Sequence, residues 1–140
     1  MAQLTNQIKS KQRVKDFAEV FTNEREVKAM CDLIPLDVWE NIESTFLEPA
    51  CGTGNFLVEI LERKYRHCKT ADDGLKALKS ITAIDIQDDN CRECRKRLLE
   101  QYISRFLDAT KENKSEAKNI VQRNVICGNS LEIMKKWEED

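Results

Sequence analysis

The sequence predicts an α/β fold, in which a mainly parallel sheet lies between two layers of helices. Apolar or β-branched segments that predict strands occur at residues 45–47, 81–86 and 124–127. Segments with apolar residues at helical spacing separate them, as parallel strands require. A glycine turn at residues 52–54 directly follows the first strand, which is the strand–turn–helix unit that binds nucleotides in such sheets. We therefore expect a three-layer α/β sandwich with a partial sheet.

Length and charge limit the classes of protein to consider. At 140 residues, of which 41% are hydrophobic, the chain fits one domain with a core of its own. The formal net charge of -2 gives no general attraction to nucleic acid, so any contact with DNA has to come from a local patch. No apolar run approaches the ~20 residues that span a bilayer, and the start lacks the apolar block of a signal peptide. We expect a cytoplasmic protein with no membrane contact.

The chain is divided into a basic amino-terminal segment, residues 1–16, and one domain, residues 17–140. The basic side chains of the segment are Lys9, Lys11, Arg13 and Lys15. They can touch phosphates, although a solvated terminus is the simpler interpretation.

A helix is predicted after the apolar segment at residues 17–22. Asn23 and Glu26 have the spacing of a capping box, and Pro35 stops the helix at about Ile34. Its predicted inner face consists of Val27, Met30, Cys31 and Ile34. Thr22 is either an ordinary cap or a hydroxyl that, with the N–H groups of the helix start, receives a carboxylate. The two interpretations are compatible.

The central stretch of the chain is FLEPACGTGNF at residues 46–56. Gly52 and Gly54 allow a sharp turn and a close approach of the backbone to a ligand, and the following helix points its first N–H groups into the same space. Glu48 stands at the carboxyl end of the strand, where its charge repels a pyrophosphate and attracts an ammonium group. This favours a zwitterionic cofactor such as S-adenosylmethionine.

The second strand ends in Asp85 and Ile86, after a short helix predicted at residues 70–79. In nucleotide-binding α/β folds, an acid at this position accepts hydrogen bonds from the ribose hydroxyls, and an apolar neighbour covers the adenine face. The interval between Gly54 and Asp85 exceeds the ~20 residues of a compact unit, because the extra helix lies between them.

A long helix is predicted from residue 88 or 89 to about residue 108. It contains Cys91 and Cys94, whose C-x-x-C spacing also occurs in zinc sites. Apolar residues recur at helical intervals around them, and the nearest further ligands, His67 and Cys68, are badly spaced for chelation, so we interpret both as core residues and expect no metal. Thiols of a cytoplasmic protein stay reduced.

The carboxyl-terminal part begins with a polar segment at residues 110–118, predicted to be a loop or the solvated start of a helix. The third strand at residues 124–127 precedes Gly128, Asn129 and Ser130. The Asn129 amide can hydrogen-bond an adenine edge, or Gly128 and Asn129 can form a turn only; turn propensities leave both open.

These motifs resemble the cofactor-binding part of amino-directed DNA methyltransferases, and most of all the N6-adenine enzymes of restriction–modification systems. The family motif acid-Pro-x-x-Gly-x-Gly stands here as EPACGTG at residues 48–54, and Val20, Phe21 and Thr22 are similar to the start of its Val-Phe-Thr-Pro element. Asn23 replaces the proline. The resemblance implies the Rossmann-like class I fold of S-adenosylmethionine-dependent methyltransferases.

The resemblance also implies the role of each site residue. Glu48 meets the amino group of the cofactor, the backbone of Ala50, Gly52 and Gly54 lines its methionine and ribose part, and Asp85 binds the ribose hydroxyls. Asn129 stands where the family usually has Asp, so its bond to the adenine amino group is expected to be weaker. The cofactor-binding residues implied are Val20, Phe21, Thr22, Glu48, Pro49, Ala50, Gly52, Gly54, Asn55, Phe56, Asp85, Ile86, Asn129 and Ser130.

The catalytic Asn/Asp-Pro-Pro-Tyr/Phe motif of the family is missing, since the chain has only two prolines, Pro35 and Pro49. We therefore expect a fragment that is inactive alone, with a truncated sheet whose unpaired edge promotes self-association. No catalytic residue is assigned. DNA and a restriction or specificity subunit are the partners expected of the longer enzyme.

Two alternatives from other classes stay open. One is a methyltransferase fragment that acts on protein glutamine or RNA, because related enzymes share the same catalytic motif. The other is a non-catalytic cofactor sensor or scaffold. A nicotinamide oxidoreductase fits less well, because Glu48 would face the phosphates.

Overall fold

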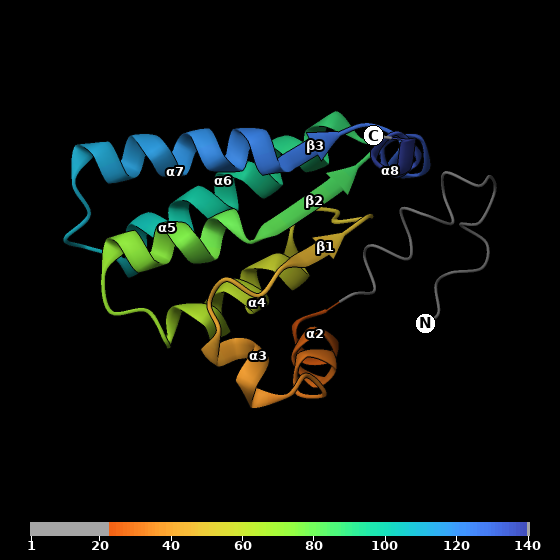
Figure 1. Cartoon of the computed structure of the whole chain (residues 1–140). Coiled ribbons are helices and arrows are strands. Elements are labelled where there is room, and N and C mark those ends of the chain that lie inside the picture. The colour runs from red at the N-terminus through yellow and green to blue at the C-terminus, as the bar shows by residue number, and fades with distance from the viewer. Residues whose placement is uncertain (1–22, 140) are drawn as a thin grey trace.

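The computed structural model describes residues 23–139 and contains a three-stranded parallel sheet (Figure 1). The strands are β1 (Phe46–Glu48), β2 (Ile81–Asp85) and β3 (Val125–Cys127), in the spatial order β1-β2-β3. Phe46 pairs with Ile81, and Asp85 pairs with Cys127. All three strands were predicted, to within about a residue at each end. The α/β class and the parallel sheet are thus confirmed.

Helices precede, connect and follow the strands. They are α2 (Glu24–Cys31), α3 (Leu36–Glu40), α4 (Asn55–Tyr65), α5 (Ala71–Lys79), α6 (Asp88–Arg105), α7 (Lys111–Asn124) and α8 (Ser130–Glu139). None of the helices between residues 23 and 139 combines the length and apolar composition needed to cross a membrane. The basic segment 1–16 and the upstream residues Val20, Phe21 and Thr22 lie outside the described residues.

Side-chain caps determine where several helices begin. The Asn23 side chain accepts a 3.0 Å hydrogen bond from the backbone N–H of Glu26, as its spacing predicted. Helix α2 ends at Cys31, before the predicted end at Ile34, and Met30 is 56% exposed although it was expected on the inner face. Val27 and Cys31 are buried as expected.

The polar segment at residues 110–118 is the start of helix α7, not a loop. Thr110 and Asn113 form a reciprocal capping box, in which each side chain accepts from the backbone N–H of the other at 3.0 Å. Further along the helix, Ala117, Ile120 and Val121 are buried. The solvated start of the helix therefore carries the cap, and the buried face begins only at Ala117, near the middle of the helix.

Two helices, α4 and α6, pack on one face of the sheet, whereas α5 and α7 lie beyond the amino ends of β2 and β3 and lead directly into them (Figure 1). Right-handed connections that move in one direction along a parallel sheet place their helices on the same face. The opposite face carries Leu47, Ile84 and Ile126, of which Leu47 is 43% exposed. The helices of residues 23–139 thus do not build the second helical layer of the expected sandwich.

A buried lysine joins the amino-terminal ends of the first two strands. Lys64 of α4 donates through Nζ to the carbonyl oxygens of Ile42 and Ser44, just before β1, and to the Ser80 hydroxyl, just before β2. Burial lowers the pKa of Lys64 to about 8. This lysine lies at the edge of the sheet opposite the glycine turn, so its role is structural.

Candidate functional site

The glycine turn joins the carboxyl end of β1 to the start of α4. Gly52 has φ 55° and Gly54 has φ 99°, and these are the conformations that glycine adopts without a steric penalty. The backbone N–H of Cys51 donates to the carbonyl of Ile84 at 2.9 Å, and that of Gly54 donates to Cys51 at 2.9 Å. The turn is therefore fixed to the end of β2 as well as to β1.

Asp85 is the acid that holds this turn. It is only 4% exposed. One carboxylate oxygen accepts from the backbone N–H of Gly52 at 2.9 Å, and the other accepts from the backbone N–H of Gln87 at 2.9 Å and from the Asn90 side chain at 3.2 Å. The predicted ribose-binding acid lies beside the glycine turn as expected. Most of its acceptor capacity is used within the chain.

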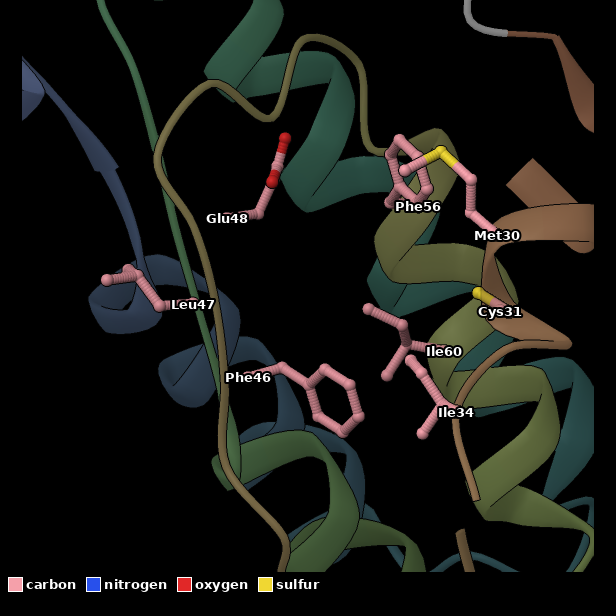
Figure 2. A pocket seen from close by; sticks show the side chains of 8 residues that line it. All are labelled: Met30, Cys31, Ile34, Phe46, Leu47, Glu48, Phe56 and Ile60. Carbon is pink, nitrogen blue, oxygen red and sulfur yellow. The ribbon is translucent and has the colours of Figure 1, made fainter. Parts of the chain in front are cut away.

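Glu48 lies on a cavity of about 270 Å³ between α2, α4 and β1. The lining residues are Met30, Cys31, Ile34, Phe46, Leu47, Glu48, Phe56 and Ile60. Figure 2 shows the Glu48 carboxylate directed into this space, with Phe56 across it. Burial, with a smaller contribution from the charge of Asp85, raises the pKa of Glu48. The cavity is therefore apolar except for one acid at its rim.

Within residues 23–139, no donor hydrogen-bonds to the Glu48 carboxylate and no cation pairs with it. A half-buried carboxylate without a partner is costly, and a bound cation removes that cost. The acceptor positions of the Glu48 carboxylate are therefore unoccupied by the residues that the structure describes.

Arg97 of α6 is a site residue that the sequence reasoning missed. Its Nη1 donates to the Thr53 carbonyl at 2.9 Å, to the Thr53 hydroxyl at 3.3 Å and to the Asn55 side-chain oxygen at 2.8 Å. Gln101 and Arg105 follow at intervals of four residues and donate to α4 at the carbonyls of Val58 and Tyr65. In the sequence, the polar residues at intervals of four on this helix were the pattern that could have indicated Arg97 as a contact residue.

The predicted adenine-binding residues have different environments. Ile86 is 49% exposed next to Asp85, so an apolar surface exists where a base was expected to lie. Asn129 caps α8, because its side-chain oxygen accepts from the backbone N–H of Glu132 at 3.1 Å. Ser130 is the first residue of that helix. Asn129 is therefore a helix cap, which is neither the adenine contact nor the simple turn that the sequence left open.

The predicted thiols on α6 are core residues. Cys91 and Cys94 are both 0% exposed, as their helical spacing indicated. The Cys94 sulfur also limits the turn, since a Cβ at Gly54 would lie 2.9 Å from it. Cys94 thus belongs to the core and also leaves no room for a side chain at Gly54.

The structure brings Glu48, Gly52, Gly54 and Asp85 to one edge of the sheet, with Asn55 and Phe56 in the first turn of α4 and Pro49 and Ala50 exposed in the connection. Asn129 and Ser130 lie at the end of the neighbouring strand β3. Comparison with protein-family models, curated proteins and solved structures found no match for the chain. Its function has to be inferred from the arrangement of these residues.

Proposed function

We propose that this chain binds S-adenosylmethionine at the carboxyl ends of β1 and β2, as the cofactor-binding part of an adenine-N6 DNA methyltransferase. One observation carries the proposal. An acid at the end of β1, a turn of two glycines with positive φ and an acid at the end of β2 converge at one sheet edge, where Gly52 and Asp85 are 2.9 Å apart. Ligands of open α/β sheets bind at this edge.

The end of the site at Glu48 fits the amino acid part of the cofactor. An ammonium group offers three donors and a positive charge, and the carboxylate of Glu48 faces the cavity without a partner among the described residues. The surrounding side chains of Phe46, Phe56 and Ile60 are apolar, and a charge pair is stronger in apolar surroundings than in water. The fit at this end rests on charge and on desolvation.

The end of the site at Asp85 fits a ribose less fully. A carboxylate has about four acceptor positions, and hydrogen bonds within the chain occupy three of those of Asp85. One hydroxyl can therefore bind without displacement, and a second requires the Asn90 amide to move. The exposed side chain of Ile86 supplies an apolar surface for a base. We expect modest affinity from this end.

In this proposal the chain supplies binding and orientation. When bound, the cofactor supplies a methyl group on a sulfonium that an amino nitrogen can attack. Glu48 and the glycine turn hold its position, which is a proximity effect and requires no acid or base from this chain. The class I methyltransferase fold, contact with DNA and a restriction or specificity subunit belong to the proposed longer enzyme.

Calorimetric titration of the full chain with S-adenosylmethionine tests the proposal. We expect the wild type to bind and Glu48→Gln to bind at least about tenfold more weakly, about 1.4 kcal/mol, because the charge is lost. Glu62→Gln, at an exposed position of α4, is the matched control and should bind like the wild type. Absence of binding by the wild type overturns the proposal.

A second ligand makes the test specific for the amino group. Methylthioadenosine has the adenosine part but lacks the amino acid part. Glu48→Gln should leave its affinity unchanged, whereas an equal loss for both ligands would show that the variant perturbs the whole site.

A non-catalytic module is the second candidate, and one observation favours it. Both Asp85 and Asn129, which were expected to contact the cofactor, already accept hydrogen bonds within the chain. A scaffold would retain these bonds as structural links. Failure of the wild type to bind either ligand supports this candidate.

A further inference from the structure

Two thiols lie around the same short backbone segment at the end of β2. The sulfur of Cys91, in the first turn of α6, is 3.4 Å from the carbonyl oxygen of Asp85 and 3.8 Å from that of Ile126. The sulfur of Cys127, the last residue of β3, is 3.9 Å from the carbonyl oxygen of Ile86. The two sulfurs therefore lie next to the carbonyl oxygens of two consecutive residues, Asp85 and Ile86, at the end of β2.

The register of the sheet directs these side chains toward each other. Cys127 pairs with Asp85, and it lies on the same sheet face as Val125, which α6 covers. The Cys91 sulfur lies 3.8 Å from the carbonyl oxygen of Ile126, the residue directly before Cys127. Strand β3 and helix α6 therefore bring the two thiols to the same strand end, around the carbonyls of Asp85, Ile86 and Ile126.

The two thiols differ in access to solvent. Cys127 is exposed, whereas Cys91 is 0% exposed. Burial, together with the contact with Cys127, raises the pKa of Cys91 to about 12, so its thiol stays protonated at neutral pH. An external reagent therefore meets Cys127 first, and Cys91 is reached only through it.

We propose that Cys127 and Cys91 form an oxidation site for hydroperoxides, in which Cys127 reacts first and Cys91 closes a disulfide. The Cys127 sulfur attacks the O–O bond of the peroxide; an S–O bond forms, the O–O bond breaks and an alcohol, or water from hydrogen peroxide, leaves. The Cys91 sulfur then attacks the sulfenic sulfur, so that the S–S bond forms, the S–O bond breaks and the hydroxide leaves as water with the Cys91 proton. Two thiols are oxidised and one peroxide is reduced.

The other cysteines do not offer the same reaction. Cys51 and Cys94 are only 7% and 0% exposed, so neither is the first thiol that an external reagent meets. Cys31 is buried and Cys68 is half-buried with no thiol partner in residues 23–139. No group of three or more metal-ligating side chains occurs in that range, so the chemistry of the Cys91 and Cys127 pair is that of a dithiol. The inference does not depend on what the glycine turn binds.

Peptide mapping of the full chain after treatment with hydrogen peroxide tests the proposal. The reduced protein is treated at low concentration, the remaining thiols are alkylated, and the digest is analysed by mass spectrometry without reduction. We expect one linked peptide pair, Cys91 with Cys127, while the other four of the six cysteines are alkylated. A Cys127 that is oxidised to sulfinic acid without a link, or a link only between two molecules, overturns the proposal.

Two variants assign the roles of the thiols. Cys91→Ser should accumulate a sulfenic acid at Cys127 that dimedone traps, and Cys127→Ser should leave Cys91 reduced. Because Cys127 is exposed, Cys127→Ser is expected to fold even if Cys91→Ser does not. Cys68→Ser is the control and should leave the linked peptide unchanged. Oxidation of Cys91 in Cys127→Ser, at the wild-type rate, would contradict the assigned order.

Discussion

The backbone N–H of Gly52 donates a 2.9 Å hydrogen bond to the carboxylate of Asp85, 33 residues further along the chain. The bond joins the turn after β1 to the end of β2, at the edge where the proposed cofactor binds. Asp85 also accepts from the backbone N–H of Gln87 at 2.9 Å. One carboxylate thus satisfies two backbone donors that no helix or strand ladder supplies with an acceptor.

Removing this carboxylate should destabilise the fold. Asp85→Ala removes the carboxylate that accepts from the N–H groups of Gly52 and Gln87, and we expect the free energy of unfolding to fall by about 2–6 kcal/mol, at roughly 1–3 kcal/mol for each donor. Urea unfolding measures the change. Asp85→Asn keeps one oxygen acceptor, so its loss of unfolding free energy should be smaller than that of Asp85→Ala. A stability of Asp85→Ala equal to that of the wild type would show that water replaces the carboxylate.

The positive φ of Gly54 gives a second prediction. Gly54→Ala places a Cβ at φ 99° and 2.9 Å from the Cys94 sulfur, so we expect a loss of about 1–3 kcal/mol in unfolding free energy. Adding Cys94→Ala removes the clash but not the backbone strain. The double variant should therefore be more stable than the sum of the two single losses predicts. Simple additivity in urea unfolding would mean that the sulfur contact costs nothing.

Arg97 should control the rigidity of the glycine turn. Arg97→Met removes three hydrogen bonds to Thr53 and Asn55, and we expect a loss of about 1–3 kcal/mol, because one donor group is charged. Local opening should also rise, so the Gly54 amide should exchange its hydrogen faster than in the wild type.

Two comparisons separate this effect from a general one. Lys96→Met removes an exposed charge from the same helix and should change neither stability nor exchange. Arg97→Lys retains the charge but not the planar group, so it should recover only part of the loss. Unchanged exchange of the Gly54 amide in Arg97→Met would contradict the assigned role.

Much of the fold follows from local patterns in the sequence. The ends of the strands and the glycine turn place Glu48 and Asp85 at one sheet edge, because the carboxyl ends of adjacent parallel strands meet there. The Asn23 cap was likewise predicted from spacing within one helical turn. Such features depend on residues close in the chain, so their patterns are readable without a structure.

Features that depend on distant residues were not predicted. Arg97 bonds to residues 42 and 44 positions away, and nothing in its own segment names those partners. Met30 has the spacing of an inner residue, but α2 packs through Val27 and Cys31 only, leaving Met30 at the rim of the cavity. The turn propensity of Asn129 was compatible with two roles, and its cap on α8 appears only once that helix is placed.

The buried lysine at the opposite edge predicts a dependence of stability on pH. Burial lowers the pKa of Lys64 from the ordinary 10.5 to about 8. Between these values the unfolded chain binds more protons than the folded chain, so the contribution of Lys64 to unfolding free energy rises with pH in this window, by at most about 1.4 kcal/mol per pH unit. Below pH 8 both states are protonated and the contribution is constant.

Urea unfolding of the wild type and of Lys64→Met between pH 7 and pH 10.5 isolates this contribution, because cysteine and tyrosine ionisation acts on both proteins and cancels in the difference. The stability of the wild type relative to Lys64→Met should be constant up to about pH 8 and then increase. Lys118→Met, at an exposed position of α7, is the control: its unfolding free energy should change with pH in the same way as that of the wild type. If the difference in unfolding free energy between the wild type and Lys64→Met stays constant over the whole pH range, the Lys64 amine has the same pKa in the folded and unfolded states. If the wild type instead loses stability relative to Lys64→Met as the pH rises, the hydrogen bonds of Lys64 require its charged form.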